Sequence, residues 1–148
     1  MIRITQTYLN NITIEYFLKF NWELLYNDLP GGRRSGVGRV AEINKLWEGI
    51  YNLSPDILLI KEGVLLLLEV DNTFNLEYEK KLLRFKEKKQ QLIEGLERVL
   101  ERKIQNMNFG FVSKSKKIPT DINEELRPFH FLYYSDEQIN EIITCSEI

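Results

Sequence analysis

The sequence predicts a mixed α/β domain, and three features carry that prediction. Two apolar runs of strand length, residues 57–61 and 64–71, are joined by a two-residue link, Glu62-Gly63, which is typical of a β-hairpin. Their near-continuous Ile, Leu and Val content indicates strands that are covered on both faces. A long segment with apolar residues at helical spacing follows at residues 76–103, and aromatic-rich strands come after it.

Composition sets the class of protein. The chain has 148 residues, which suits one domain with its own core, so we expect a single domain over residues 1–148. It is 43% hydrophobic and 28% charged, with eight Gly and four Pro, which excludes disordered, collagen-like and low-complexity classes. The single Cys (Cys145) and single His (His130) exclude an internal disulfide and a Cys/His zinc site.

The charge and hydropathy pattern limits the nucleic-acid and membrane partners that the protein can bind. A net charge of −2 at pH 7 excludes a uniformly basic nucleic-acid-binding domain, so any nucleic-acid surface must be local. The first residues contain no apolar stretch of signal-peptide length, and the most apolar run, residues 64–68, is far too short to span a membrane. We therefore expect a soluble cytoplasmic protein that has no membrane partner.

The first part of the chain predicts a helix, a strand and an insertion. Residues 5–20 carry apolar side chains at helical spacing, and residues 22–29 form a short strand that ends at Pro30-Gly31-Gly32. An insertion at about residues 30–52 combines a basic Gly/Arg loop with a short helix over residues 38–52. Arginines among glycines favour a nucleic-acid contact loop, although a solvated basic turn explains them equally well. These arginines are Arg33, Arg34 and Arg39.

The segment at residues 76–103 predicts a long helix with a basic surface. Its apolar stripe runs through Leu82, Phe85, Leu92, Leu96 and Val99. Between residues 78 and 103, nine basic residues against five acidic ones give +4, in a chain whose total is −2. This concentration marks a candidate nucleic-acid contact, with a solvated helix face as the alternative. The residues that we expect to make this contact are Lys80, Arg84 and Lys88.

The last third of the chain predicts two strands and a helix. Residues 108–112 and 129–134 are aromatic-rich strands, separated by a lysine-bearing loop. Residues 135–143 are expected to form a closing helix, because Ser135 is a good N-cap and two acidic residues follow it in the first turn.

Carboxylates at one end of the hairpin are the candidate chemical groups. Asp56 opens the first hairpin strand, while Glu69 and Asp71 close the second, so antiparallel pairing brings Asp56 and Glu69 together. Glu69 and Asp71 are two residues apart in a strand, which places them on one face. Such carboxylates are costly unless they are hydrogen-bonded or bind a cation such as Mg²⁺ or Mn²⁺. The alternative is that these acids are turn residues or lie at an exposed edge.

The hairpin resembles a known metal site. The segment from Ser54 to Asp71, which reads SPDILLIKEGVLLLLEVD, is similar to the metal-binding hairpin of the PD-(D/E)XK nuclease superfamily. The resemblance implies a restriction endonuclease-like fold, a mixed central sheet flanked by helices with a helix, strand, hairpin, helix, strand core. It also implies that Asp56 and Glu69 bind Mg²⁺ (or Mn²⁺). A first-helix acid often joins them, and Glu15 is the candidate, with Glu42 as its rival.

The motif departs from the family at one position. The family's final lysine, which orients and activates the attacking water, is replaced by Asp71. Some members use an acid there, and others supply the lysine from the following helix, where Lys80 and Lys81 lie. The E-V-D strand end, followed by the segment from Lys81 to Phe85, also resembles plasmid replication-relaxation proteins. This second likeness implies a phage, plasmid or other mobile-element setting.

The resemblance leads us to expect a Mg²⁺-dependent DNA endonuclease or a related DNA-processing protein. Asp56 and Glu69 would hold the metal, Asp71 would be a further ligand or position the water, and Lys81 would neutralise the transition state. Symmetry in double-strand cleavage favours a homodimer. The alternative is a catalytically inactive nuclease-fold module that binds DNA or a protein partner. A third class, a structural or regulatory protein, draws on its aromatic residues as dimer contacts: Trp47, Tyr51, Tyr133 and Tyr134.

Overall fold

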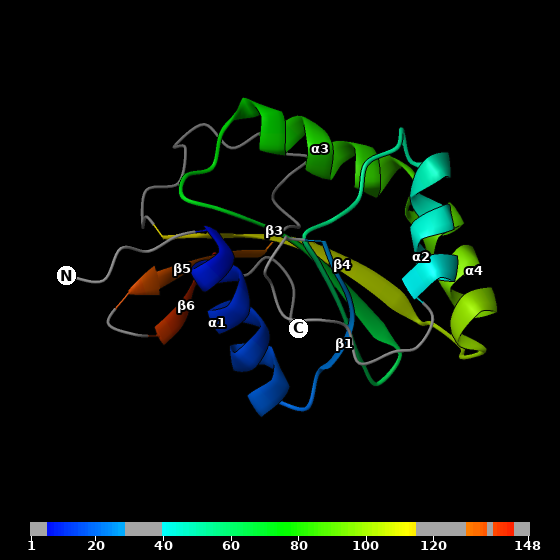
Figure 1. Ribbon diagram of the computed structural model, residues 1–148, viewed down its shortest axis with the longest axis horizontal. Coiled ribbons are helices and arrows are strands. Elements are labelled where there is room, and N and C mark those ends of the chain that lie inside the picture. Colours follow the sequence, from blue (N-terminus) through cyan, green and yellow to red (C-terminus); the bar gives the residue numbers. More distant parts are fainter. Residues whose placement is uncertain (1–5, 29–39, 115–129, 136–137, 144–148) are drawn as a thin grey trace.

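The computed structural model describes residues 6–28, 40–114, 130–135 and 138–143, and these form one open sheet with helices on both faces (Figure 1). The six strands are β1 (Glu23–Asn27), β2 (Ile57–Lys61), β3 (Val64–Asp71), β4 (Asn106–Ser113), β5 (His130–Ser135) and β6 (Gln138–Ile143). The helices are α1 (Gln6–Lys19), α2 (Val40–Leu46), α3 (Leu76–Glu87) and α4 (Lys89–Leu100), with a 3-10 turn η1 (Trp47–Gly49). The predicted mixed α/β class is confirmed.

The sheet combines both kinds of strand pairing. Its spatial order follows the chain, β1-β2-β3-β4-β5-β6. The pairs β1/β2, β2/β3 and β5/β6 are antiparallel, whereas β3/β4 and β4/β5 are parallel. A parallel neighbour requires a crossover connection, and α3 and α4 supply it between β3 and β4.

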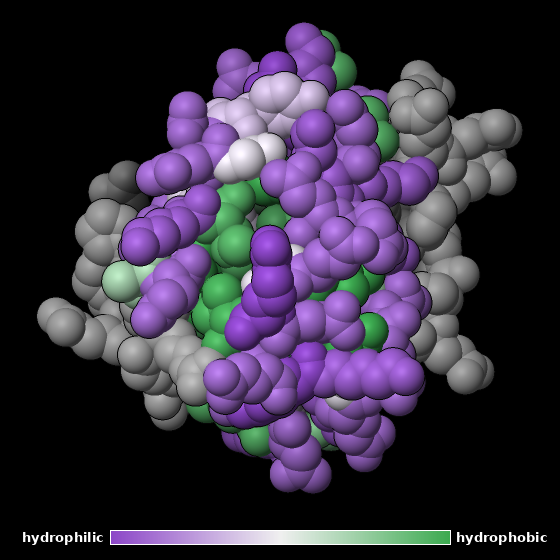
Figure 2. Space-filling model, turned by 90° about the vertical axis from the view of Figure 1, so that its right-hand side faces the viewer, coloured by the Kyte–Doolittle hydropathy of each residue, from purple (hydrophilic) through white to green (hydrophobic). Residues whose placement is uncertain are grey.

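The helices form two layers that cover opposite faces of the sheet. In Figure 1, α1 lies on one face, while α2, α3 and α4 lie on the other. The core divides in the same way, because Leu66, Leu68 and Val70 of β3 pack in the cluster of α1. Leu65 and Leu67 pack instead in the cluster that contains residues of α2, α3 and α4. Side chains alternate along a strand, so Glu69 belongs to the face covered by α3. Figure 2 shows the end of the molecule that carries α2 and α4, where hydrophilic side chains surround smaller exposed areas of apolar residues.

The turn between β2 and β3 fixes the register of the hairpin. Glu62 and Gly63 both have left-handed backbone conformations, with φ of 50° and 80°. Two successive positive φ values characterise the two-residue hairpin turns whose twist matches that of the flanking strands. Lys61 therefore pairs with Val64, and the ladder continues to Ile57 opposite Leu68. The predicted hairpin is confirmed.

The predicted long helix is interrupted at one residue. Lys88 has φ of −98° and ψ of 15°, and it separates α3 from α4. Leu82 and Phe85 of α3 are buried in the same cluster as Leu92 and Leu96 of α4. The change of direction thus keeps both apolar stripes against one face of the sheet, which a straight helix of that length would leave.

The predicted closing helix is wrong. Residues 138–143 form β6, an antiparallel strand in which Ile139 pairs with Tyr134 and Gln138 with Ser135. Ser135 and the acids after it are local helix-start signals, but pairing with β5 satisfies the backbone and buries Ile139. The predicted helix over residues 38–52 is also shorter than expected, because α2 ends at Leu46 and η1 follows.

Two predictions concern other parts of the chain. Arg33, Arg34 and Arg39, which form the predicted basic loop, lie outside the described residues. Within the described ranges, no helix is both long enough and apolar enough to cross a membrane.

Candidate active site

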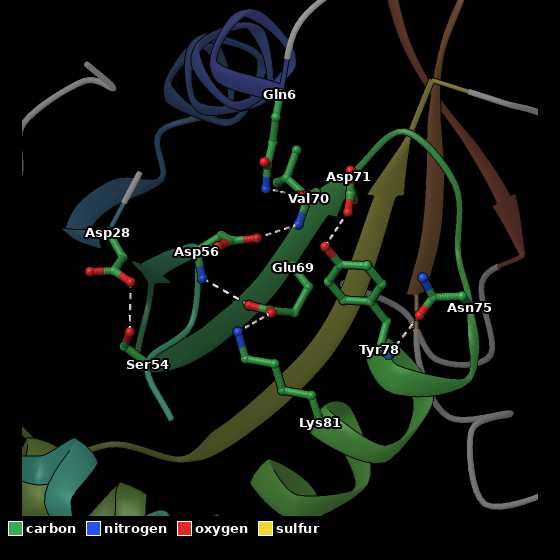
Figure 3. A network of polar contacts seen from close by, with 10 residues as sticks. All are labelled: Gln6, Asp28, Ser54, Asp56, Glu69, Val70, Asp71, Asn75, Tyr78 and Lys81. Carbon is green, nitrogen blue, oxygen red and sulfur yellow. Dashed lines mark hydrogen bonds and ion pairs between the residues drawn. The ribbon is translucent and has the colours of Figure 1, made fainter. Parts of the chain in front are cut away.

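Asp56 and Glu69 meet at the open end of the hairpin. Ile57 pairs with Leu68, so Asp56 and Glu69 are the next two residues along the same ladder. The Asp56 amide donates a hydrogen bond to Glu69 Oε2 at 2.8 Å, and the Val70 amide donates to Asp56 Oδ2 at 2.8 Å (Figure 3). Each carboxylate therefore binds the backbone of the opposite strand. The predicted juxtaposition is confirmed, whereas the functional role of the pair stays a prediction.

Lys81 brings a positive charge to this pair from α3. Its Nζ forms an ion pair with Glu69 Oε1 (Figure 3). The Glu69 side chain is fully buried, while that of Lys81 remains 24% exposed. The Lys81 ammonium is the charged partner of Glu69 Oε1 in the described part of the chain. The structure thus places a lysine at the acid end although β3 carries Asp71 at the lysine position of the motif.

Burial makes both carboxylates unfavourable as anions. Burial and the charge of Asp56 raise the pKa of Glu69 to about 8, against the opposing effects of Lys81 and the Asp56 amide. Burial also raises the pKa of Asp56, and the Val70 amide and Lys81 oppose that rise. Two acids held at such a cost favour a functional explanation over a purely structural one.

Asp71 is engaged elsewhere. The Tyr78 hydroxyl donates to Asp71 Oδ2, and the Asn72 amide donates to Asp71 Oδ1 at 2.7 Å. Asn75 caps α3 by accepting hydrogen bonds from two amides, including that of Tyr78, which fixes the first turn (Figure 3). Burial and the bond to Asp71 raise the pKa of Tyr78. Both oxygens of Asp71 therefore have partners outside the acid pair, and its predicted role at the metal stays a prediction.

The candidate third acids lie away from the pair. Glu15 lines a hollow beside Gln138 and Ile139, on the α1 side of the sheet, and Glu42 is exposed in the first turn of α2. In the part of the chain that the structure describes, no group of three or more acidic, His or Cys side chains could hold a metal. What α1 contributes near the site is Gln6, whose Nε2 donates to the Val70 carbonyl at 2.8 Å. A lone glutamine gives no sequence signal for this role.

A second polar network supports the segment before Asp56. The Tyr26 hydroxyl donates to Asp28 Oδ1 at 2.9 Å, and the Ser54 hydroxyl donates to Asp28 Oδ2 at 2.7 Å. The Asp28 amide donates to the Asp56 carbonyl at 3.1 Å. Burial and the contact with Asp28 raise the pKa of Tyr26 to about 12. Sequence reasoning missed Asp28, because an Asp at a strand end is also an ordinary turn residue.

The pair fits a small hard cation. Mg²⁺ keeps several waters and is usually bound through one or two carboxylates together with substrate phosphates. Asp56 and Glu69 each commit one oxygen to a backbone amide, and the second oxygen of Glu69, Oε1, faces the Lys81 ammonium. The donor chemistry therefore suits Mg²⁺ or Mn²⁺ held by two carboxylates.

The predicted nucleic-acid contacts continue along α3 from Lys81. Lys80 and Arg84 are exposed, and Lys88 is half-buried at the end of this helix. The Arg84 guanidinium lies 5.3 Å from the centre of the Tyr51 ring, and Lys88 Nζ lies 5.7 Å from it. These cations are positioned on the same element as the lysine of the acid pair.

Comparison of the chain with protein-family models, with curated proteins and with solved structures finds no match. The chemistry of Asp56, Glu69 and Lys81, and the mixed sheet that carries them, therefore indicate what this protein can do.

Proposed function

We propose that this protein is a Mg²⁺-dependent DNA endonuclease with a restriction endonuclease-like core, belonging to a phage, plasmid or other mobile element. The observation that supports the proposal most is the ion pair between Lys81 of α3 and Glu69 of β3, which restores a lysine to a motif that lacks one. The order of helix, strand, hairpin, helical crossover and parallel strand agrees with the core implied by the resemblance.

Asp56, Glu69 and Lys81 would have separate roles in the reaction. Asp56 and Glu69 would hold the cation through the oxygens that accept no backbone hydrogen bond, with Glu69 Oε1 exchanging its contact with Lys81 for one with the cation. When bound, Mg²⁺ or Mn²⁺ polarises a phosphodiester and lowers the pKa of a water molecule. The Lys81 ammonium beside Glu69 offers positive charge for the phosphate as negative charge develops on it. The hydrogen bonds between the strands fix these groups before the substrate arrives.

The substrate would approach along α3. Lys80 and Arg84 are exposed on this helix and are able to contact phosphates, which supply most of the affinity in such interfaces. A single site cuts one strand, so cleavage of a duplex by this site requires either two copies of the chain or two successive events.

A cleavage assay with matched variants tests the proposal. Purified protein is incubated with supercoiled plasmid, single-stranded DNA and a four-way junction, each with Mg²⁺, Mn²⁺ or EDTA. We expect metal-dependent nicking that falls at least about 100-fold in Asp56→Asn and Glu69→Gln, and about 100- to 1,000-fold in Lys81→Met. Glu15→Gln is the control, because Glu15 lies beside β6, and it should cleave within about twofold of the wild type.

Two outcomes would contradict the nuclease proposal. Undiminished cleavage by Asp56→Asn would remove Asp56 from the site. Absence of cleavage by a folded wild type on every substrate would favour the alternative, an inactive nuclease-fold module that binds DNA or a protein. Asp71 at the lysine position of the motif is the observation that favours this alternative. DNA binding in EDTA with no cleavage in Mg²⁺ or Mn²⁺ would support it.

A further inference from the structure

Tyr51 presents an aromatic ring at the surface on the α3 side of the sheet. It follows η1, and 51% of the residue is exposed. Tyr51 and Asn52 both adopt left-handed backbone conformations, with φ of 54° and 55°. Bulky residues rarely occupy this region, because it costs energy for side chains that have a Cβ. The turn therefore holds a large aromatic side chain outward where a small or polar residue would be easier to accommodate.

Three residues of α3 and its C-cap hold the ring in place. The Arg84 guanidinium and Lys88 Nζ lie 5.3 Å and 5.7 Å from the ring centre, both within the range of cation–π attraction. The Tyr51 hydroxyl donates a hydrogen bond to Glu87 Oε1 at 3.1 Å. The hydroxyl bond to Glu87 and the two cations thus fix the orientation of the ring, while about half of the residue remains exposed to solvent.

The ring is connected to the acid pair by two routes. Along the sequence, Tyr51 precedes Asp56 by five residues. Along α3, Lys81, Arg84 and Lys88 follow one another at spacings that keep them on one side of a helix. Because an α-helix rises 1.5 Å per residue, Lys88 lies about 10 Å along the axis from Lys81. A row of cations therefore leads from the carboxylates to the ring.

We propose that Tyr51, Arg84 and Lys88 form a stacking site for an unpaired nucleobase, with the two cations binding its flanking phosphates. The ligand is accordingly single-stranded nucleic acid, or a single-stranded branch next to duplex. A base inside a duplex is stacked on both faces and cannot reach the ring, whereas an unpaired base stacks on aromatic side chains with little regard to sequence. The proposal rests on the proposed function only in making this strand the substrate, since the binding itself needs no metal.

Binding measurements in EDTA test this proposal apart from cleavage. Fluorescence anisotropy with dye-labelled dT15, rU15 and a blunt 15-base-pair duplex gives the dissociation constants of the wild type and of three variants. We expect Tyr51→Ala to weaken dT15 binding by about 5- to 150-fold, because stacking contributes that much per base, and to leave the duplex within about twofold. Tyr51→Phe should bind like the wild type, because it keeps the ring. Phe20→Ala is the matched control, since Phe20 is an equally exposed aromatic (52%) next to α1.

A probe in the oligonucleotide reports the stacking directly. With 2-aminopurine in the middle of dT15, the wild type and Tyr51→Phe should change its fluorescence, and Tyr51→Ala should not. Comparison of dT15 with rU15 shows whether DNA or RNA is preferred. Tyr51→Ala should weaken binding of whichever oligonucleotide the wild type binds more tightly. Two results would overturn the proposal: dT15 and rU15 affinities of Tyr51→Ala within twofold of the wild type, or equal weakening of single strand and duplex. Failure to cleave any substrate would count against the nuclease proposal alone.

Discussion

Two ion pairs of this protein lie in opposite environments. Glu23 and Arg102 form a two-bond pair at the surface, with Arg102 Nη1 and Nη2 at 2.8 Å and 3.2 Å from the carboxylate oxygens, and nearly half of each side chain is exposed. Glu69 and Lys81 form a pair in which the carboxylate is fully buried and the lysine is 24% exposed. The first connects the segment after α4 to the start of β1, and the second connects α3 to the acid end of the hairpin.

The contrast shows which pair is costly to maintain. At the surface, water already solvates both charges, so a well-formed bond adds little stability even though it raises the pKa of Arg102. In the interior, the carboxylate has lost its water, and its attraction to one lysine does not fully offset that loss. The sequence retains the unfavourable pair where three polar groups converge, which is the arrangement expected of a functional site.

Among single substitutions, removing the cation of the buried pair should destabilise the protein most. Lys81→Met should lower the free energy of unfolding by up to about 2 kcal/mol at pH 8.5, because Glu69 must then either stay ionised without its cation or take up a proton above its folded pKa of about 8. Urea unfolding in EDTA measures the change. Lys80→Met is the control, since Lys80 is exposed on the same helix and should change stability by less than about 0.5 kcal/mol. At pH 5 the loss should shrink, because a proton neutralises Glu69; an equal loss at both pH values would assign it to packing of the lysine chain.

The buried pair should also make stability depend on pH. The folded pKa of Glu69, about 8, lies above its ordinary value of 4.5, so the folded protein holds this proton more tightly than the unfolded chain. The resulting stability is complete below pH 4.5 and is lost as pH rises to 8, by up to about 1.4 kcal/mol per pH unit. Unfolding of the wild type and Glu69→Gln across this range measures it. The difference in unfolding free energy between the wild type and Glu69→Gln should change with pH as described. If the two pH curves stay parallel, the pH dependence does not come from Glu69.

A smaller effect is expected at the edge of the buried region. Tyr78→Phe should lower the free energy of unfolding by about 1–2 kcal/mol, because it removes a half-buried hydrogen bond to the Asp71 carboxylate. Chemical denaturation at pH 7 is the measurement. The matched control is Tyr51→Phe, which removes an exposed hydrogen bond to Glu87 and should cost less than about 0.5 kcal/mol. Equal stability of Tyr78→Phe and the wild type would show that water replaces this contact.

The smallest effect is expected at the surface pair. Glu23→Gln should lower stability by less than about 1 kcal/mol in low salt. In 1 M NaCl the difference from the wild type should vanish, because the screening length falls to about 3 Å. Thermal unfolding at both salt concentrations tests this expectation. A salt-independent loss above about 2 kcal/mol would remove the distinction between the exposed and the buried pair.

The features that depend on neighbouring residues follow from the amino-acid order alone. The two-residue link Glu62-Gly63 between two apolar runs predicts the hairpin, and the hairpin register then places Asp56 beside Glu69. The apolar stripe likewise predicted which side of the segment at residues 76–103 is buried. In each case the chain's own periodicity and turn chemistry carry the information.

The features that depend on distant partners were set by long-range packing and strand pairing. Residues 138–143 have a helix-start signal before them, yet their backbone groups pair with β5. Lys80 and Lys81 are alike in their local sequence, and although the resemblance pointed to Lys81, it is the packing of α3 on the sheet that turns Lys81 toward Glu69 and leaves Lys80 exposed. Local signals act over a single turn of chain, whereas burial and long-range pairing decide which polar group loses its water and needs a partner.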